Sequence, residues 1–320
     1  MSDHINIVFA SDNNYAQHLC VTMVSILHNT NMKEMVRFYI LSDNIVASNK
    51  LKINETVSRF GAGIIFIDVD DTMFRKVYVS GHISRAAYFR LMIGELVPKE
   101  IDKIIYLDVD LLVYKDIIEL WNSDMKMMPI AAVTDYGIIS SSRLRKQKSE
   151  VIGVENGESY FNSGVLVLDL QQWREKKYGD MIIEAVTKQN FPHHDQDALN
   201  KIFMNKWSVL PLEWNVIPPV FNLFMKILFS NKLRKMALKA KRNLAILHFA
   251  GRYKPWEFVN TVGFNDKYYE YLSLTEFAKV VMPQPSKDMK GKSLFRQIIR
   301  LKIANVWLKV FDNIKWLQFH

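Results

Sequence analysis

Short apolar runs alternate with longer amphipathic stretches over the first two-thirds of the chain. Each apolar run is too short for a helix and lacks strict polar alternation, which favours strands buried on both faces. The runs occupy residues 5–11, 36–42, 63–69, 103–108, 129–134 and 164–168. The stretches with a helical pattern are residues 15–28, 47–59 and 84–94. Strands joined by helices predict a doubly wound α/β domain with a parallel sheet.

Residues 286–320 have a different pattern. Two tryptophans, Trp307 and Trp316, are of the kind found at membrane interfaces, and lysine and arginine are frequent. The segment fits either a helix that packs on the domain or an amphipathic helix on an anionic membrane, and we favour the membrane-bound form. The apolar residues that recur at helical spacing are Phe295, Ile299, Ile303, Val306, Val310, Ile314 and Leu317.

The composition is that of a globular protein. Of the 320 residues, 49% are hydrophobic, 23% charged and 12% aromatic, which excludes disordered and collagen-like classes. The formal net charge is +9, but residues 221–243 carry +7 and residues 286–320 carry +6, which leaves −4 for the rest. Because the net positive charge is concentrated in two apolar-interleaved segments and no nucleic-acid-binding motif occurs, we expect no nucleic-acid partner.

The sequence also bears on location. We find no pattern of a secretory signal near residue 1 and no run near the ~20 apolar residues of a membrane-spanning helix. The single cysteine, Cys20, excludes an intrachain disulfide and fits a reducing compartment. We therefore expect a cytoplasmic protein that associates peripherally with the inner face of the cytoplasmic membrane through residues 286–320.

The strongest candidate for chemistry is Asp108-Val109-Asp110, which directly follows a predicted buried strand. Residues two apart in an extended chain point the same way, so both carboxylates can hold a hard divalent cation. Magnesium or manganese would suit them and could bridge a diphosphate. The same spacing recurs at 68–70, where a polar stretch predicts a solvated turn, and at 195–197. The turn at residues 10–15 lacks the glycines of a dinucleotide site.

Two histidine-containing segments are further candidates. His248 ends an apolar run and leads into a segment with glycine, arginine and lysine, which fits either a metal and phosphate site or a core histidine beside a basic loop. Residues 193–197 read His-His-Asp-Gln-Asp. They fit a metal cluster, a sugar-binding site, or the start of a helix with Asp195 as N-cap. The residue types alone leave these alternatives open.

Together, six ordered motifs make the chain resemble glycosyltransferase family 8. This family comprises retaining UDP-sugar transferases, among them bacterial lipopolysaccharide and lipooligosaccharide galactosyl- and glucosyltransferases, and glycogenin. The resemblance extends from residue 5 to about residue 256. The motifs lie at residues 7–15, 82–84 with Tyr88 and Arg90, 106–110, 160–165, 195–197 and 248–256.

The resemblance implies a fold and a division of the chain. The fold is the GT-A type, an α/β Rossmann-like mixed sheet with helices on both faces. Residues 1–285 would form the catalytic domain, with a donor-binding part at about 1–135 and an acceptor-binding and metal-completing part at about 136–285. Residues 286–320 would form the basic amphipathic tail. Residues 139–159, with serines and mixed charge, are expected to be a mobile loop over the donor.

The resemblance also implies contacts with the nucleotide and the metal. Asp12 would accept a hydrogen bond from the uracil imide, Tyr15 would stack on the base, and Asn14 would help to hold the nucleotide. The implied metal is manganese, with magnesium as the alternative, and its implied ligands are Asp108, Asp110 and His248. The other residues implied in binding the UDP-sugar are His82, Arg90, Val109, Asn162, Gly251 and Lys254.

The implied catalytic residues are Gln196, Asp195 and Asp135, around the donor sugar. Retention of the anomeric configuration can proceed through a covalent intermediate or by front-face attack, in which the leaving phosphate takes the acceptor proton. A glutamine is a poor nucleophile, so we favour front-face attack with Gln196 stabilising positive charge on the sugar.

The expected function is transfer of galactose or glucose from a UDP-sugar to a glycan acceptor, such as lipopolysaccharide, lipooligosaccharide or another cell-surface glycan. A glycogenin-like enzyme that glycosylates itself or another protein is the alternative activity. A catalytically inactive UDP-sugar-binding protein is the alternative from another class. The donor sugar, the acceptor, the linkage and the oligomeric state stay open.

Overall fold

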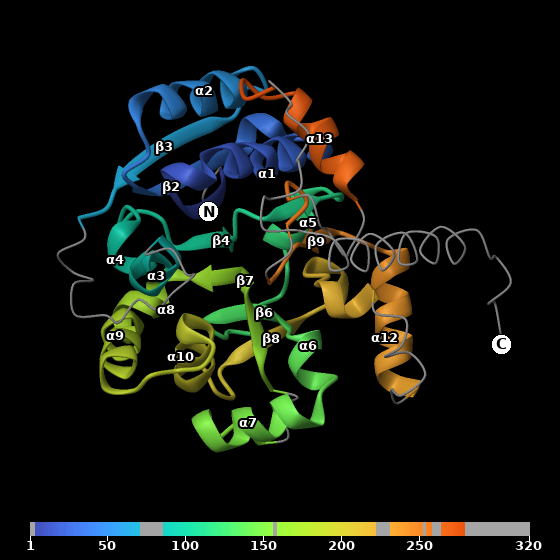
Figure 1. Ribbon diagram of the computed structural model, residues 1–320. Coiled ribbons are helices and arrows are strands. Elements are labelled where there is room, and N and C mark those ends of the chain that lie inside the picture. The colour runs from blue at the N-terminus through green and yellow to red at the C-terminus, as the bar shows by residue number, and fades with distance from the viewer. Residues whose placement is uncertain are drawn as a thin grey trace, which may run out of the picture.

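The computed structural model describes residues 4–70, 86–155, 159–221, 231–251, 254–257 and 264–278. The strands in these residues form a seven-stranded sheet, in the order β3-β2-β1-β4-β7-β6-β8, and a two-stranded sheet of β5 and β9 (Figure 1). The large sheet consists of β1 Ile5–Asp12, β2 Val36–Asp43, β3 Gly63–Asp68, β4 Lys103–Leu107, β6 Ile130–Thr134, β7 Phe161–Asp169 and β8 Trp207–Leu210. The small sheet consists of β5 Leu111–Val113 and β9 Ile246–His248.

Strand β7 makes the sheet mixed. It pairs antiparallel with β4 and β6, whereas β3, β2, β1 and β4 run parallel, as do β6 and β8. The mixed sheet implied by the family resemblance is therefore confirmed, and the all-parallel sheet predicted from the apolar pattern is wrong. β7 is buried at every position but its last. A central antiparallel strand covered on both faces has the same continuous apolar sequence as a parallel one, so the pattern carries no direction.

The hydrophobic core lies on both faces of the sheet, because successive residues of a strand point to opposite sides. In β1, Ile7 and Phe9 pack with α1 (Ala16–Asn29) and α2 (Ala47–Ser58), whereas Val8 and Ala10 pack on the other face. The helices of that second face are α3 Ala86–Phe89, α4 Ile93–Leu96, α8 Leu170–Glu175, α9 Tyr178–Lys188 and α10 His194–Ile202.

Helix α1 is buried along most of its length and carries Cys20, which has no exposed surface. Burial raises the pKa of the Cys20 thiol to about 12. Because the thiolate is the reactive form, this cysteine is chemically inert at neutral pH in the folded chain.

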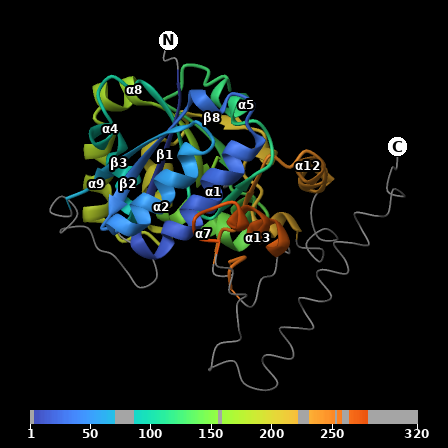
Figure 2. The same ribbon diagram turned by 90° about the horizontal axis from the view of Figure 1, so that it is seen from above.

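Further helices lie around the sheet. They are α5 Ile117–Trp121, α6 Tyr136–Ile139, α7 Ser142–Ile152, α12 Asn231–Arg242 and α13 Asn265–Ser273. Helix α12 buries Ala237 and Ala240 and lies at the margin of the molecule (Figure 2). The 3-10 turns are η1 Asn13–Tyr15, η2 Lys33–Met35, η4 Arg90–Met92, η6 Leu212–Trp214 and η7 Pro218–Phe221.

Two sequence predictions need correction here. The loop conformation expected at 139–159 is wrong for residues 142–152, which form α7, while movement of the segment over the donor stays a prediction. Ser141 caps its first turn, accepting a hydrogen bond from Leu144 N at 3.3 Å, and Gly153 ends it with a left-handed φ of 80°. The helix expected at 84–94 is broken, since η4 separates α3 from α4.

Within the described residues, every helix is too short or too polar to cross a lipid bilayer. The basic tail predicted at residues 286–320 lies outside the described residues, so its prediction stays untested.

Four strand ends meet at one edge of the sheet and position the site. β1, β4 and β6 end there, and antiparallel β7 begins there, with Leu107 opposite Val165 and Val133 opposite Asn162. Ligands of open α/β sheets bind at the carboxyl ends of the parallel strands. The observed edge is therefore where a ligand is expected.

Substitution Gly94→Ala should destabilise the fold by about 1–3 kcal/mol, because a methyl group there would lie 2.3 Å from Trp173 Cδ1. Trp173 is fully buried, and its ring packs against the rings of Tyr178 and Phe203. Urea unfolding measures the change. Gly63→Ala is the control, since its methyl group meets the Arg37 side chain at 3.4 Å. Equal stability of the two variants would contradict the packing argument.

Candidate functional site

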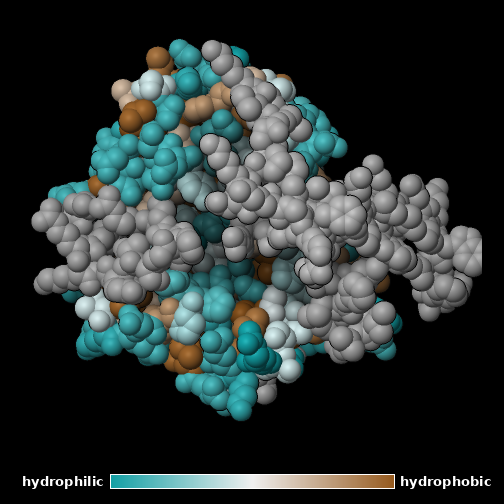
Figure 3. All heavy atoms as spheres, in the orientation of Figure 1, coloured by the Kyte–Doolittle hydropathy of each residue, from teal (hydrophilic) through white to brown (hydrophobic). Residues whose placement is uncertain are grey.

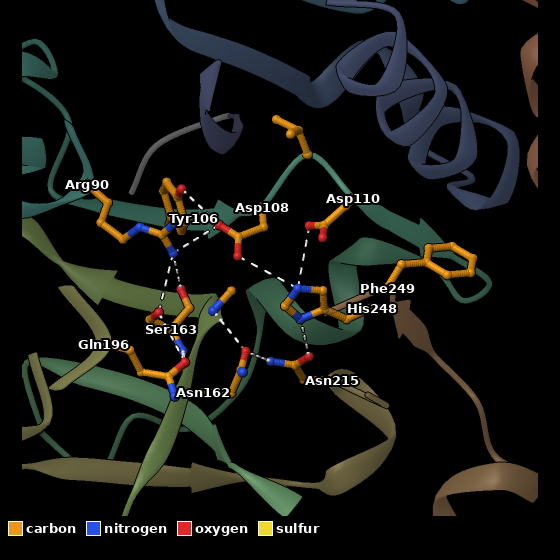
Figure 4. Close-up of polar contacts among 12 residues, drawn as sticks. Arg90, Tyr106, Asp108, Asp110, Asn162, Ser163, Gln196, Asn215, His248 and Phe249 are labelled. Atoms are coloured by element: carbon orange, nitrogen blue, oxygen red, sulfur yellow. Dashed lines mark hydrogen bonds and ion pairs between the residues drawn. The ribbon is translucent and has the colours of Figure 1, made fainter. Parts of the chain in front are cut away.

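The carboxyl edge of the sheet carries a hollow with hydrophilic walls (Figure 3). Side chains from several elements turn toward one another within it (Figure 4). They come from η4, the segment between β4 and β5, β7, α10 and β9.

Asp108, Asp110 and His248 form the centre of the site. β5 pairs antiparallel with β9, so that Leu111 lies opposite His248 and the preceding Asp110 reaches the imidazole. His248 Nε2 lies 3.4 Å from Asp110 Oδ1 and 3.7 Å from Asp108 Oδ2. One ligand atom from each residue lies within 4.8 Å of the other two. Two carboxylates and an imidazole in this arrangement fit a divalent cation.

Asn215 fixes the tautomer of His248. Asn215 Nδ2 donates to Asn162 Oδ1 at 2.8 Å, so its carbonyl oxygen faces His248 Nδ1 at 2.9 Å and accepts the Nδ1 proton. Nε2 then carries the lone pair, directed toward the two aspartates (Figure 4). Metal-ligating histidines are held in this way, by a hydrogen bond from the ring nitrogen that does not bind the metal.

Gly164 leaves the space that the imidazole occupies. A methyl group at this position would lie 2.4 Å from His248 Cε1 and 2.7 Å from Asp108 Oδ2. Gly164 also fixes the local backbone, since Asp108 N donates to Gly164 O at 2.9 Å. A glycine is therefore required where β7 passes behind the three candidate ligands.

Arg90 neutralises the first aspartate. Its side chain is buried, with Nη1 at 2.9 Å from Asp108 Oδ1, and it donates to Ser163 O at 3.0 Å. The guanidinium carbon lies 4.8 Å from the centre of the Tyr106 ring, and Tyr106 OH donates to Asp108 Oδ1 at 3.0 Å. Burial alone would lower the pKa of Arg90, but Asp108 and other nearby acidic groups outweigh it, and the pKa is raised.

Asp195 lies on the other side of the same guanidinium. It is in the first turn of α10, which begins at His194, so the N-cap alternative is excluded. Its Oδ2 lies 3.1 Å from Arg90 Nε but accepts no hydrogen bond from the described residues. Burial raises the pKa of Asp195, and Arg90 opposes the shift. A buried carboxylate oxygen thus keeps unused capacity to accept a hydrogen bond.

Lys254 pairs with the second aspartate. Its Nζ lies 2.5 Å from Asp110 Oδ2 and donates to Phe249 O at 2.8 Å. Burial alone would raise the pKa of Asp110, but the Lys254 cation outweighs burial, and the pKa is lowered. Asp110 therefore carries its charge next to Lys254.

Gln196, Asp135 and Asn162 form a connected group. Asp135 Oδ2 accepts from Gln196 Nε2 and from Asn162 Nδ2, each at 3.1 Å. Gln196 Oε1 accepts from Ser163 N at 3.1 Å. Asp135 Oδ1 accepts from Ile138 N, which makes it the N-cap of α6. The three predicted residues are therefore in direct contact.

The turn after β1 holds the remaining predicted group. Asp12 Oδ1 accepts from Asn14 N at 2.8 Å and from Tyr15 N at 3.1 Å, so Asp12 caps η1. The Tyr15 ring contacts Trp256 edge to face at 6.0 Å, and Trp256 stacks on His18 at 3.5 Å. Burial lowers the pKa of His18 to about 3, so its imidazole is neutral.

The remaining predicted residues do not belong to the contact groups described above. His82 lies outside the described residues. Val109 is partly buried, and its carbonyl accepts from Thr22 Oγ1 at 2.9 Å. Gly251 is exposed and has a φ of 96°, a conformation that favours glycine. Asp68 is 71% exposed and pairs with Lys50, as predicted for a solvated turn.

Sequence reasoning assigned no role to Asn215, Tyr106 or the buried Lys148. Asn215 bonds to His248 of β9, which is far from it in the sequence. Lys148 lies on a polar helix, and only its 0% exposure in the structure distinguishes it. A role for Gly164 had a weak signal, a glycine inside a strand pattern, which indicates close approach of another group.

Comparisons with known proteins agree with this geometry. A family model described as "Glycosyl transferase family 8" matches residues 6–260. General stress protein A of Bacillus subtilis (strain 168) is 33% identical over 284 residues, which cover 87% of this chain and 96% of that protein. Lipopolysaccharide 1,2-glucosyltransferase of Escherichia coli (strain K12) is 26% identical over 258 residues, which cover 80% of this chain and 73% of that protein.

Solved structures confirm the GT-A type of α/β fold. Galactosyltransferase LgtC, in complex with donor and acceptor sugar analogs, has a TM-score of 0.73 at 29% identity and covers 85% of this chain and 96% of its own. An active-site mutant of LgtC with glutamine changed to glutamate matches equally well. The bifunctional WbbM apo structure has a TM-score of 0.76 at 24% identity over 87% of this chain and 51% of its own, and supports the fold alone.

Substitution Gly164→Ala should weaken Mn²⁺ binding at least about tenfold, because the added methyl group displaces the His248 imidazole. Titration with Mn²⁺, followed by the electron paramagnetic resonance signal of the free ion, measures the affinity. Gly63→Ala is the matched control, since its methyl group meets a flexible side chain far from these ligands in the sheet order. Unchanged Mn²⁺ affinity in Gly164→Ala would show that His248 is not a ligand.

Proposed function

The chain belongs to glycosyl transferase family 8, and from that premise we propose that it transfers a hexose, galactose or glucose, from a UDP-sugar to a glycan acceptor with retention of configuration. The observation that carries the proposal is the Asp108–Asp110–His248 cluster with buried Arg90 and Asp195 beside it. A metal site next to a buried polar pocket suits a charged diphosphate with a sugar attached.

The three ligand residues fit manganese, or magnesium in its place. Their donor atoms are oxygen and imidazole nitrogen, their spacing allows one ion, and Asn215 leaves the Nε2 lone pair of His248 free. When bound, the metal supplies positive charge that stabilises the departing UDP.

Arg90, Asp195, Asn162 and Gln196 would hold the donor sugar. Oδ2 of buried Asp195, which pairs with Arg90 but accepts no hydrogen bond from the described residues, would accept one from a sugar hydroxyl. Gln196, whose amide is held by Asp135 and Ser163, would stabilise positive charge on the sugar during front-face attack. Asp135 would keep the amide in place, and His82 would contact the sugar from outside this group.

The nucleotide would lie across the turn after β1. Tyr15 would stack on the base, and Asp12 and Asn14 would contact the uracil and the ribose side. Gly251 would allow the chain to approach the diphosphate, and Lys254 would add a cation there. The backbone at Val109 would complete the contact.

The assignment of the acceptor rests on a relative and on the sequence, not on the geometry of the site. A lipopolysaccharide 1,2-glucosyltransferase is among the relatives, which supports a cell-surface glycan or glycolipid acceptor. In the proposed division, residues 1–135 bind the donor, residues 136–285 complete the metal and acceptor sites, and residues 286–320 contact an anionic membrane. The membrane contact rests on the sequence pattern of the tail.

The test is release of UDP from a panel of UDP-sugars that includes UDP-galactose and UDP-glucose, without acceptor, in Mn²⁺, Mg²⁺ or a chelator. Many transferases hydrolyse their donor slowly, so the acceptor need not be known. We expect metal-dependent release of UDP from one UDP-hexose. In Asp110→Asn, we expect the metal no longer to stimulate this release. Absence of UDP binding in the presence of Mn²⁺ would overturn the proposal.

Lys254→Met should separate metal binding from nucleotide binding. Without nucleotide, Mn²⁺ should bind about fivefold more tightly, because the cation that competes for Asp110 is removed. With Mn²⁺ present, UDP should bind at least about tenfold more weakly, because a charge-assisted hydrogen bond to phosphate is lost. Isothermal titration measures both affinities.

Lys50→Met is the matched control for Lys254→Met. Lys50 also lies 2.5 Å from an aspartate, Asp68, but that pair is on the surface beside β3. The variant changes the net charge equally and should change neither affinity. Weaker Mn²⁺ binding in Lys254→Met would show that Lys254 supports the metal site and does not compete with it.

A further inference from the structure

A buried ion pair lies beneath Gln196. Lys148, on α7, and Asp197, on α10, are both fully buried, and Lys148 Nζ lies 2.6 Å from Asp197 Oδ1. The same Nζ lies 2.5 Å from His193 Nδ1 and 5.1 Å from the centre of the Tyr160 ring. The proposed contacts with metal, nucleotide and sugar make no use of this pair.

The Asp197 carboxylate has both oxygens engaged. Oδ1 accepts from Lys148 Nζ at 2.6 Å and from Tyr160 OH at 2.7 Å, and Oδ2 accepts from His193 N at 2.8 Å. With three donors directed at them, both oxygens of the buried carboxylate act as acceptors. The Tyr160 hydroxyl is therefore the donor in its bond with Asp197.

The direction of that hydroxyl proton adds a third constraint on the orientation of the Gln196 amide, beside those from Asp135 and Ser163. A hydroxyl has one proton, and Tyr160 gives it to Asp197, so toward Gln196 it can only accept. Gln196 Nε2 donates to Tyr160 OH at 3.2 Å and to Asp135 Oδ2 at 3.1 Å. The amide oxygen is thereby directed to Ser163 N, 3.1 Å away. If the amide were flipped, its oxygen would face Tyr160 OH and Asp135 Oδ2, which both accept, and its nitrogen would face Ser163 N, which donates.

We propose that Lys148 is a positioning residue, which holds the Asp197 carboxylate as the acceptor of the Tyr160 hydroxyl proton and so, together with Asp135 and Ser163, fixes the orientation of the Gln196 side-chain amide. The chain of contacts runs from Lys148 to Asp197, Tyr160 and Gln196, and each of its links is a hydrogen bond or an ion pair between buried or half-buried groups. The consequence for catalysis rests on the proposed function, in which Gln196 lies against the reacting sugar.

Stability alone does not account for the pair. Burying an ammonium and a carboxylate costs solvation that their attraction barely repays, and apolar residues of similar volume serve a core at least as well. Fully buried lysine is rare for this reason. A buried pair that specifies one arrangement of a neighbouring polar group has a role that apolar residues lack.

The experiment compares Tyr160→Phe, Lys148→Met and the double variant. Tyr160→Phe removes the linking hydroxyl and keeps the ring against Lys148. With the donor found by the UDP-release panel, each single variant should lower kcat about 10- to 100-fold, as expected for a misplaced group, while UDP affinity changes less than about twofold. The double variant should be no slower than Tyr160→Phe, because both changes break the same chain of contacts.

Two controls match the single variants. Tyr114→Phe removes a buried tyrosine hydroxyl that has no hydrogen-bond partner among the described residues. Lys103→Met removes a half-buried lysine that donates to Trp121 O at 2.6 Å and lies 5.1 Å from a ring centre of that tryptophan. Both should keep the wild-type kcat. Wild-type kcat in Tyr160→Phe, additive losses in the double variant, or a parallel loss of UDP affinity would each overturn the proposal.

Lys148→Met leaves Asp197 as an uncompensated buried acid, and the variant can fail to fold for that reason. In that case Lys148→Met, Asp197→Asn takes its place, since it removes both charges. We expect the same loss of kcat as in Tyr160→Phe. Wild-type kcat in this neutral pair would overturn the role assigned to the ion pair.

A second readout separates this proposal from the proposed function. The side-chain amide resonances of Gln196, assigned through their loss in Gln196→Met, should be one sharp pair in wild type and should shift or broaden in Tyr160→Phe. This result does not depend on turnover. If wild type releases no UDP but the resonances shift in Tyr160→Phe, the proposed function is rejected and the positioning role is kept. If the resonances do not shift, the positioning role is rejected.

Discussion

The site depends on how charge is balanced where the strands end. Asp108, Asp110 and Asp195 lie close together at one edge of the sheet, and carboxylates taken out of water repel one another unless cations lie among them. Arg90 lies between Asp108 and Asp195, and Lys254 lies against Asp110. These cations come from η4 and the segment after β9, so ion pairing holds separate parts of the chain together at the site.

The charged groups and the amides of the site contribute different chemistry. Charged groups come from elements before and after β6, as Arg90 and Asp195 do, whereas the amides Asn162, Gln196 and Asn215 all come from elements after β6. Charged groups attract a diphosphate and a metal from a distance but have little directional preference. Amides have fixed donors and acceptors, so their network sets which way His248 and Gln196 point. Attraction and orientation are thus supplied by different kinds of side chain.

Much of this was accessible from the sequence, for identifiable reasons. The strand before Asp108 and the spacing to Asp110 predicted a cation site, and the two residues do share one side with His248. The direction of β7 was not accessible, because burial on both faces gives the same apolar run in either direction. The partners of Asn215 and Lys148 depend on which helices and strands pack together. The N-cap alternative for Asp195 failed because α10 begins one residue earlier.

The buried Cys20 thiol has a consequence for experiments on the whole molecule. It is the one cysteine in the sequence and is buried on the inner face of α1. A cysteine introduced on an exposed residue, such as Lys239 of α12, would therefore be the one thiol that a label reaches in the folded chain. A fluorophore or spin label could then report how α12 moves relative to the sheet, with every native residue of the core left in place. Labelling of Cys20 itself would require α1 to lift from the sheet, so its rate would measure the free energy of that opening.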